Sequence, residues 1–415
     1  MSSSSTDAES TIRMNPFVER LSTGEWNAER FRQHLAEAGA PLVERVTADE
    51  VDVTFVDEPG HDTTTRLAVV IGPVIGRNTI DTEFTPVAAT PLRTLTLRMR
   101  SDLRFSYVFT RRAPSGEDEQ VADPFNPPPR FSEYPEARFS GSSVAALPDA
   151  VPLPWLDRAQ VHPAATPEPR VLASKLLGNE RRIWVSMPPA ELADETALPF
   201  VIHLDGTPDH SAPSIRDALL QAGQIGPCVV VLVDQLGAQR YAELRCNPAF
   251  SQMLVDELLP WLHDRYPLSR DPGDVALAGE SFGALCAAWT ALHHPTAFGN
   301  AIIQSPSCAY HPDLRFGSGA GELLRRTPTP TLIADFSAAE PAPIRVFHDV
   351  GELEGSITHS RWLDHVLTAK GYDTTYREFA GGHDYAWWRG LFADALLWCF
   401  PSTGEPGRER SRERP

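Results

Sequence analysis

The sequence predicts two folded domains, a small antiparallel β-sandwich followed by an α/β domain with a mostly parallel sheet. The chain has 415 residues, which at about 100–200 residues per domain corresponds to two or three domains. Through residues 48–110 apolar and polar residues alternate, which is typical of strands with one face on a core. After residue 171 short continuous apolar runs alternate with helical patterns, which indicates a parallel sheet covered on both faces.

The first domain is expected over residues 15–145, after a polar N-terminus, residues 1–14, that we expect to be disordered. An amphipathic helix is expected over residues 27–40, because Trp26, Phe31 and Leu35 recur at helical spacing. The strands are expected where these alternating apolar residues stand: Val51, Val53 and Phe55; Leu67, Val69 and Ile71; Leu95, Leu97 and Met99; Phe105, Tyr107 and Phe109.

A proline-rich segment, residues 146–170, separates the two domains. It contains six prolines, and since proline fixes φ and removes a hydrogen-bond donor, we expect a semi-rigid linker there rather than the interior of a helix or strand. The second domain is then expected over residues 171–402. Residues 403–415 mix Arg, Glu, Gly and Pro and are expected to be a disordered tail.

The second domain begins with a hairpin signal, Gly178-Asn179, between two strand-like segments. Buried strands are expected at residues 200–204, 228–233, 275–278, 301–303 and 344–347, with helices at 248–266, 284–294 and 360–369. Ligands of such sheets bind at the carboxyl ends of the strands, so we look there for functional residues.

A nucleophile motif stands at one of these strand ends. Gly279-Glu280-Ser281-Phe282-Gly283 fits G-x-S-x-G, with an apolar strand directly before it and a helical run directly after it. The flanking glycines allow the strained strand–turn–helix that exposes the serine hydroxyl. The motif predicts that Ser281 is the nucleophile of an α/β-hydrolase fold. The alternative is a tight turn with a capping serine.

A serine nucleophile needs a base and an orienting acid. His383 follows Gly381-Gly382 on a loop after a strand-like segment, which is where the order Ser…acid…His places the base. The acid is expected in the loop after residues 344–347, where Asp349, Glu352 and Glu354 all stand. The residues alone leave these three carboxylates open.

An oxyanion hole needs two backbone N–H groups. Phe282, the residue after the nucleophile, is expected to supply one. The second is expected from Thr207 or Gly206, which follow the strand at residues 200–204. The alternative for this segment is an ordinary Asp-Gly turn.

The matching motifs resemble those of the esterase D superfamily, and more closely the enterochelin esterases. They run in family order over nearly all of residues 171–400: Leu204-Asp205-Gly206, Arg240-x-x-Glu243-Leu244, Cys246-Asn247-Pro248-Ala249-Phe250, Ala278-Gly279-Glu280-Ser281-Phe282-Gly283, Gln304-Ser305, Gly351-x-x-Glu354, Gly381-Gly382-His383-Asp384 and Trp388-Arg389-Gly390. In the first domain, Asp123-Pro124-Phe125-Asn126-Pro127 is similar to the proline-rich end of the family's β-sandwich. The resemblance implies Ser281 as nucleophile, His383 as base and Glu354 as orienting acid.

The resemblance also implies a substrate, a catecholate siderophore such as ferric enterobactin, whose ester hydrolysis would release iron in the cytoplasm. A ferric tris-catecholate is a trianion with flat rings, so we expect cations and aromatic groups around it. The candidates are Arg240, Arg245, Arg389 and Trp387. The alternative is that the arginines form structural ion pairs and that at least one of the two adjacent tryptophans lies in the core.

Composition excludes several classes of partner and cofactor. A formal net charge of −18 argues against nucleic acid as a partner, because phosphate binding needs a basic face. The five cysteines have no zinc-site spacing, so no metal site is expected. No cofactor is expected either. No apolar run approaches the ~18 residues of a membrane span, and the N-terminus lacks the pattern of a secretory signal. Two alternatives stay open: a general carboxylesterase or acyltransferase, and a catalytically silent protein that binds a siderophore or glycan.

Overall fold

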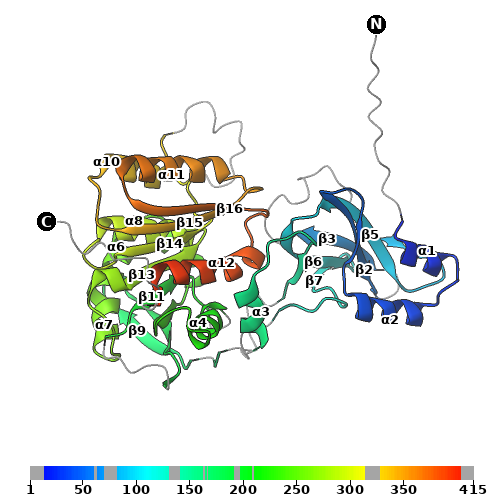
Figure 1. The fold of residues 1–415 in the computed structure, drawn as a ribbon, viewed down its shortest axis with the longest axis horizontal. Helices are drawn as coiled ribbons and strands as arrows, with labels where there is room; N and C mark the ends of the chain where they lie inside the picture. Colours follow the sequence, from blue (N-terminus) through cyan, green and yellow to red (C-terminus); the bar gives the residue numbers. More distant parts are fainter. Residues whose placement is uncertain are drawn as a thin grey trace, which may run out of the picture. The chain divides into compact units, whose positions relative to one another are not determined.

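The computed structural model describes residues 14–59, 63–69, 82–129, 141–161, 164–165, 167–190, 197–207, 210–313 and 328–402. The expectations for residues 1–13, for Ile71 and for residues 403–415 lie outside this part of the chain. The chain forms two compact units (Figure 1), and the boundary between them lies between Pro152 and Leu153.

Unit 1 consists of two antiparallel sheets. Its elements are α1 (Pro16–Ser22), α2 (Ala28–Ala38), β1 (Leu42–Arg45), β2 (Glu50–Asp57), β3 (Thr64–Val69), β4 (Thr85–Pro86), β5 (Arg93–Arg100), β6 (Arg104–Arg112), β7 (Asp118–Val121) and β8 (Ser143–Ala146). One sheet has the order β1-β2-β5-β4, and in the other β6 pairs with β3, β7 and β8. The rings of Phe55 in β2 and Tyr107 in β6 meet with centroids 5.0 Å apart, so the sheets pack face to face. The predicted antiparallel sandwich is confirmed.

Strand β2 differs from the expected pattern because its polar side chains are also buried. Asp52 is 4% exposed and Asp57 0% exposed. Arg98 donates to both carboxylate oxygens of Asp52, at 2.6 and 2.9 Å. Asp57 receives Arg111 Nε at 3.1 Å and the Thr65 hydroxyl at 2.8 Å. Buried carboxylates require such partners. Asp52 lies on the face that alternation assigned to water, whereas Asp57 shares the face of Val53 and Phe55. Ion pairs therefore allow one carboxylate to be buried on each face of the strand.

The Asp-Pro-x-Asn-Pro motif has a structural role in unit 1. The Tyr107 hydroxyl donates to Asp123 Oδ2 at 2.7 Å, and Asn126 Nδ2 donates to the Tyr107 oxygen at 3.0 Å and to the Val144 carbonyl at 2.8 Å. Asp123 is 1% exposed. Burial raises its pKa to about 6, although its hydrogen bonds oppose the shift. The motif therefore ties the segment after β7 to strands β6 and β8.

A helix occupies part of the segment that we expected to be a linker. Helix α3 (Pro154–Val161) begins at a proline, which is tolerated in the first turn because its missing N–H has no partner within the helix. Leu153, Leu156 and Ala159 are buried in the same core as residues of unit 2. The chain thus enters unit 2 at Leu153 rather than at residue 171.

Unit 2 is built on one mixed sheet with the order β16-β15-β14-β13-β11-β12-β10-β9. Its strands are β9 (Arg170–Ser174), β10 (Asn179–Ser186), β11 (Phe200–Leu204), β12 (Val229–Val233), β13 (Val275–Glu280), β14 (Asn300–Gln304), β15 (Arg345–Gly351) and β16 (Asp373–Phe379). Strands β11 to β16 run parallel, whereas β10 is antiparallel to both β12 and β9. The mostly parallel sheet and the predicted hairpin are confirmed.

The helices of unit 2 are α4 (Ala212–Gln221), η2 (Gly237–Gln239), α5 (Arg240–Leu244), α6 (Pro248–Met253), η3 (Leu254–Leu258), α7 (Leu259–His263), η4 (Pro272–Asp274), α8 (Phe282–His293), α10 (Thr331–Ala338), α11 (Ile357–Lys370) and α12 (Tyr385–Cys399). The helix expected over 248–266 is interrupted by a π-helical turn, η3, directly before α7, whose second residue is Pro260. Pro260 has no N–H for an α-helical bond, which explains the change of winding.

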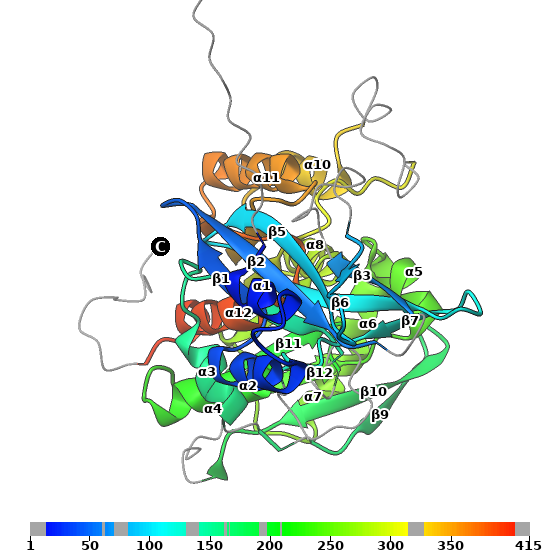
Figure 2. The same ribbon diagram turned by 90° about the vertical axis from the view of Figure 1, so that its right-hand side faces the viewer.

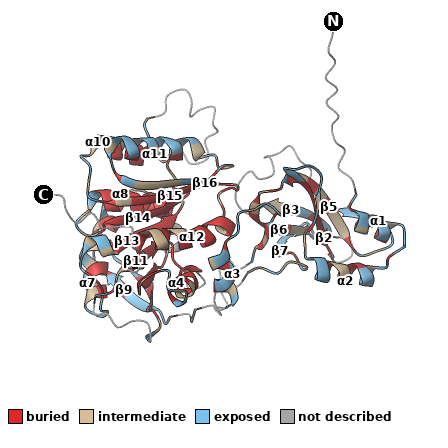
Figure 3. Cartoon of the chain, in the orientation of Figure 1, coloured by how far each residue is buried: buried red, intermediate tan, exposed pale blue. Residues whose placement is uncertain are grey.

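Both faces of this sheet are covered. One core joins the sheet to α6, α7, α8, α10 and α11, and the other joins it to α3, α4 and α12. Figures 1 and 2 show α10 and α11 at the β16 end of the sheet and β9 at the opposite end. Strands β11, β12, β13 and β14 are buried at every residue (Figure 3). This double burial is why their sequences are mostly apolar rather than alternating.

Candidate active site

Ser281 lies on a strained turn between β13 and α8. Its φ is +57°, a value that costs free energy in a residue with a side chain. The turn closes so tightly that a Cβ on Gly279 would lie 2.6 Å from the carbonyl carbon of Gly283. The Ser281 N–H donates to the Gln304 carbonyl at 3.0 Å, which ties the turn to β14. The predicted strand–turn–helix is therefore present.

His383 and Glu354 form a hydrogen-bonded pair. His383 Nδ1 lies 2.8 Å from Glu354 Oε2, and the side chains are 27% and 1% exposed, respectively. A carboxylate can only accept here, so the His383 proton lies on Nδ1 and Nε2 of the neutral ring carries the lone pair. This is the arrangement of a general base oriented by a buried acid.

The structure distinguishes the three candidate acids. Besides His383, Glu354 accepts the Gly351 N–H at 2.8 Å, the Ser356 hydroxyl at 3.1 Å and the Ser305 hydroxyl. Asp349 is buried within β15, where it accepts Gln304 Nε2 at 3.0 Å. Burial raises the pKa of Asp349 well above its ordinary value.

Glu352 has an exposed side chain. Of the three carboxylates, the structure brings Glu354 alone into hydrogen-bond contact with His383.

The Ser281 hydroxyl is not hydrogen-bonded to His383. Its partner is the Ser307 hydroxyl, with the two oxygens 3.3 Å apart, and the Ser307 N–H also donates to the Ser281 carbonyl at 3.0 Å. Hydrogen bonds between nucleophile and base are often long in ligand-free enzymes and tighten when substrate binds. Ser307 is a contact of Ser281 that the sequence reasoning missed.

The segments expected to form the oxyanion hole lie side by side. A Cβ on Gly283 in α8 would lie 3.5 Å from Asp205 Oδ2, in the loop after β11. In that loop Asp205 has a φ of +63°. A Cβ on Gly206 would lie 2.7 Å from Leu232 Cβ, so only glycine fits. The Thr207 carbonyl accepts the His210 N–H at 2.9 Å, a bond within the loop itself.

Two of the predicted arginines lie near the nucleophile turn. Arg240 donates through Nε to Asp205 Oδ2 at 2.8 Å, in the ion pair that we weighed as the alternative. The Arg245 guanidinium lies 4.9 Å from the ring centre of Tyr241, 5.0 Å from that of Phe282 and 5.8 Å from that of Tyr310. We call Arg240, Tyr241, Arg245 and Tyr310 the Arg–Tyr cluster. Neither tyrosine was among the predicted site residues.

Trp387 and Arg389 are buried in α12. Trp387 is 1% exposed, stacks on Phe379 with ring centroids 5.1 Å apart and donates through Nε1 to the Ala380 carbonyl at 3.2 Å. The expectation that Trp387 stacks on a substrate is therefore corrected, because its ring faces are packed in the core. Arg389 is 8% exposed, with its guanidinium 5.7 Å from the Tyr385 ring centre, so it too lacks an open surface.

A buried ionic cluster lies behind the nucleophile turn. Glu280 Oε1 is 3.2 Å from His203 Nε2 and 3.4 Å from His210 Nε2. Burial opposes ionisation of Glu280, but the two histidines outweigh it and lower the pKa of Glu280. His203 Nδ1 contacts the Leu204 carbonyl at 3.0 Å.

These three side chains are the one group of His, Cys, Asp and Glu among the described residues that is compact enough for a metal ion. His210 Nδ1 accepts the Ala212 N–H at 3.1 Å. Its ring proton is therefore on Nε2, toward Glu280, which leaves no lone pair there for a metal. The group is thus an ion-pair cluster, and it was missed because the sequence separates its members widely.

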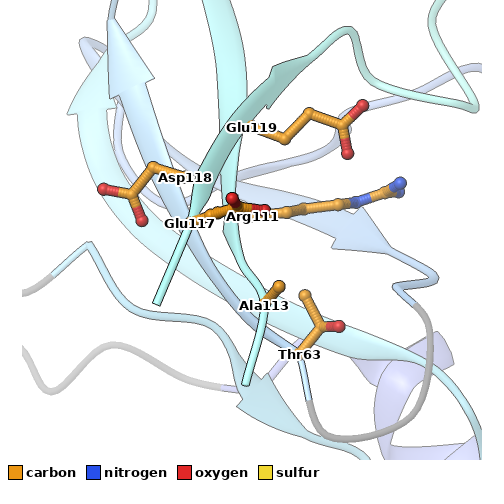
Figure 4. Close-up of a pocket in the computed structure, with 6 residues that line it drawn as sticks. All are labelled: Thr63, Arg111, Ala113, Glu117, Asp118 and Glu119. Atoms are coloured by element: carbon orange, nitrogen blue, oxygen red, sulfur yellow. The ribbon is translucent and has the colours of Figure 1, made fainter. Parts of the chain in front are cut away.

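Unit 1 contains a cavity of about 620 Å³ (Figure 4). Its lining residues are Thr63, Arg111, Ala113, Glu117, Asp118 and Glu119. Asp118 is paired with Arg112 at 2.7 Å, and the lining contains no nucleophile beside a base. The candidate active site is therefore the turn at Ser281 and not this cavity.

The fold and the site define a class. A strained serine after β13, with a histidine–glutamate pair from the loops after β16 and β15 on a mostly parallel sheet, is the arrangement of an α/β-hydrolase. The family follows from the sequence comparison: residues 174–399 match the model of the putative esterase family, and the chain belongs to that family.

Relatives extend the likeness to the whole chain. An iron(III) enterobactin esterase of Dickeya dadantii (strain 3937) is 27% identical, over 95% of this chain and 97% of its own length. An iron(III) salmochelin esterase of Escherichia coli O6:H1 is 26% identical, over 89% of this chain and 93% of its own length. The resemblance to enterochelin esterases is thereby confirmed.

Solved structures share the two-unit fold. The enterobactin esterase of Shigella flexneri, crystallised in the presence of enterobactin, superposes with a TM-score of 0.71 at 22% identity, over 86% of this chain and 95% of that one. The ferric enterobactin esterase of Salmonella typhimurium gives a TM-score of 0.70 at 23% identity, over 90% and 98%. The α/β-hydrolase fold with an N-terminal antiparallel domain is confirmed. In the part of the chain that the structure describes, no helix combines the length and apolar character needed to cross a bilayer.

Proposed function

We propose that this protein is a serine esterase that hydrolyses the ester bonds of a catecholate siderophore of the ferric enterobactin type. The observation that carries the proposal is the 2.8 Å contact between His383 and the buried Glu354, in a chain that also has a serine on a nucleophile turn. The full-length likeness to enterobactin and salmochelin esterases supports the choice of substrate.

The proposed reaction is acyl transfer through Ser281. Its hydroxyl attacks the ester carbonyl while His383 Nε2 accepts the hydroxyl proton, and Glu354 stabilises the imidazolium that forms. The N–H of Phe282 and that of Thr207 or Gly206 hold the oxyanion. His383 then gives the proton to the leaving alcohol. Water deacylates the enzyme by the same steps, which regenerates the serine and releases the acid.

The Arg–Tyr cluster is the proposed contact for the catecholate part of the substrate. Arginine pairs with oxyanions and stacks on rings, and exposed tyrosine offers a flat surface to a catechol. Arg245 lies within cation–π distance of Phe282, the residue after the nucleophile, and the Tyr241 side chain is 47% exposed. Hydrolysis would lower the number of catechols joined in one ligand and so weaken its hold on iron, which we place in the cytoplasm.

The test is mass spectrometry of the products formed from ferric enterobactin by the wild-type protein and by Ser281→Ala. We expect cleavage to linear or monomeric catechol units by the wild type, and a loss on the order of 10⁶ in rate for the variant. Retention of more than about a thousandth of the turnover by Ser281→Ala would contradict the mechanism.

Two further measurements separate the alternative functions. Preference for small neutral esters over the ferric catecholate would indicate a general carboxylesterase. If a fluorophosphonate probe leaves Ser281 unlabelled, the protein binds its ligand without hydrolysing it.

A further inference from the structure

One side chain, Trp388, contacts both the base and a partner of the acid. Its ring meets that of His383 edge-on, with centroids 4.7 Å apart and planes at 90°. Its Nε1 donates to the Ser305 hydroxyl oxygen at 2.8 Å. The backbone carbonyl of Trp388 accepts Gln304 Nε2 at 3.1 Å. The adjacent residues Gln304 and Ser305 therefore fix Trp388 at two points, and the side chain is 2% exposed.

The direction of these hydrogen bonds is determined by the groups involved. The Trp388 indole nitrogen is a donor only, so Ser305 Oγ must accept from it. The Ser305 proton is then directed to Glu354 Oε1, its other partner. Ser305 is fully buried with a φ of +46°, and its N–H donates to the Asp349 carbonyl at 2.8 Å. The hydroxyl therefore has a fixed position and a single proton direction.

We propose that Trp388 and Ser305 form a positioning pair that holds the Glu354 carboxylate in the orientation needed by His383. The inference rests on the proposed Ser–His–Glu mechanism. Ser305 and the Gly351 N–H together occupy Oε1, so Oε2 is the oxygen presented to His383 Nδ1. Without the Ser305 hydroxyl, Oε1 keeps only the Gly351 N–H. The carboxylate is then held less firmly, and the 2.8 Å bond to His383 loses part of its alignment. Since neither member of the pair is proposed to touch substrate, the effect belongs in kcat and not in KM.

The experiment uses the full-length chain, a short p-nitrophenyl ester and the rate of fluorophosphonate labelling at Ser281. Ser305→Ala and Trp388→Phe are each expected to lower kcat by roughly 10- to 100-fold, the range for a lost hydrogen bond in a charged network. KM is expected to stay within about twofold, because a positioning residue does not change ground-state binding. Phenylalanine keeps an aromatic ring beside His383, so Trp388→Phe tests the indole N–H.

The double variant is the decisive measurement. If the indole acts through the serine, Trp388→Phe in the Ser305→Ala background costs less than about threefold, because the path is already broken. The matched controls are Trp387→Phe, which loses an indole bond to a backbone carbonyl, and Ser251→Ala, a fully buried serine bonded to Thr290 at 3.0 Å. Both controls are expected to keep kcat within about threefold of the wild type.

Three results would overturn the proposal. The first is a Ser305→Ala variant with wild-type kcat. The second is a double variant in which the fold-losses in kcat of the two single variants multiply, as they do for independent sites. If Ser305→Ala does not fold, as judged by its melting temperature, an equal change in kcat and KM for Trp388→Phe is the third. A wild-type protein that resists labelling at Ser281 refutes the esterase proposal itself, and this outcome is distinct because the wild type alone reveals it.

Discussion

Substitution of Glu354 by glutamine is the most informative single perturbation of the candidate active site. The amide has the shape of the carboxylate, but one of its oxygens becomes an NH₂ group. That group must replace either Oε1, which accepts the Gly351 N–H at 2.8 Å, or Oε2, which accepts His383 Nδ1 at 2.8 Å. The backbone N–H of Gly351 can only donate, so an NH₂ group opposite it loses a hydrogen bond and costs about 1–3 kcal/mol.

The orientation that avoids this cost places the NH₂ group against His383. The His383 ring can adapt by moving its proton from Nδ1 to Nε2. The Ser356 hydroxyl, which donates to Glu354 at 3.1 Å in the wild type, can become an acceptor in the variant. The stable variant therefore carries its imidazole proton on Nε2, the atom that must accept the Ser281 proton. In serine hydrolases a base locked in the wrong tautomer loses on the order of 10⁴ in kcat, about 5.5 kcal/mol of barrier.

The assay is the kcat of Glu354→Gln on a p-nitrophenyl ester at neutral pH. Glu352→Gln, a change at an exposed carboxylate two residues earlier, serves as the control and is expected to stay within about twofold of the wild type. If Glu354→Gln keeps more than about a tenth of the wild-type kcat, the tautomer argument is refuted. A loss confined to the control would assign the acid to Glu352.

Three further predictions address close packing, pH and substrate charge. A Cβ on Gly351 would lie 2.5 Å from the Gly381 carbonyl oxygen, so Gly351→Ala is expected to lower kcat about tenfold and the free energy of unfolding by about 1–3 kcal/mol. The control is Gly355→Ala, because a Cβ on Gly355 would meet no atom within 4 Å. It is expected to change neither quantity. Asp123 has a pKa of about 6 in the folded protein against 3.8 ordinarily, so the folded state binds its proton more tightly than the unfolded state does. The contribution of this proton to the free energy of unfolding is fully present below pH ~4. It is lost as the pH rises through ~6, which lowers the free energy of unfolding by about 3 kcal/mol. Urea titrations of Asp123→Asn should lack this loss, and an unchanged pH profile would contradict the assignment. Arg245→Met is expected to raise KM for a ferric catecholate about tenfold without changing KM for a neutral ester; equal changes for both substrates would exclude a charge-specific contact.

The elements that the sequence predicts well are those whose environment is uniform along the segment. Strand β12 (Val229–Val233) is buried on both faces, and each of its residues is apolar. Strand β11 (Phe200–Leu204) is buried in the same way and departs from the apolar pattern only at His203. Strand β2 was predicted only in part. Its buried polar positions depend on Arg98 and Arg111, which lie 46 and 54 residues from Asp52 and Asp57 in the chain. A local pattern contains no information about such partners.

The same limit applies to the candidate site. The G-x-S-x-G turn is local, and its strand–turn–helix geometry could be predicted from five neighbouring residues. The choice among Asp349, Glu352 and Glu354 could not, because it depends on which side chain faces His383, 29 residues beyond Glu354. Trp387 and Trp388 are adjacent in sequence, yet one packs on Phe379 and the other contacts His383. The rotation of α12 about its axis on the sheet decides which of the two tryptophans faces the core and which faces His383.

Helix α3 has a practical consequence for dividing the protein into parts. Its apolar residues Leu153, Leu156 and Ala159 belong to the core of unit 2. A Cβ on Gly390 in α12 would lie 2.4 Å from Leu153 Cδ1, so α12 is shaped around that leucine. A fragment that begins after the prolines, at residue 171, would expose the surface that these side chains cover. The recombinant fragment to express is therefore 153–402, and a fusion or domain exchange should be joined between Pro152 and Leu153.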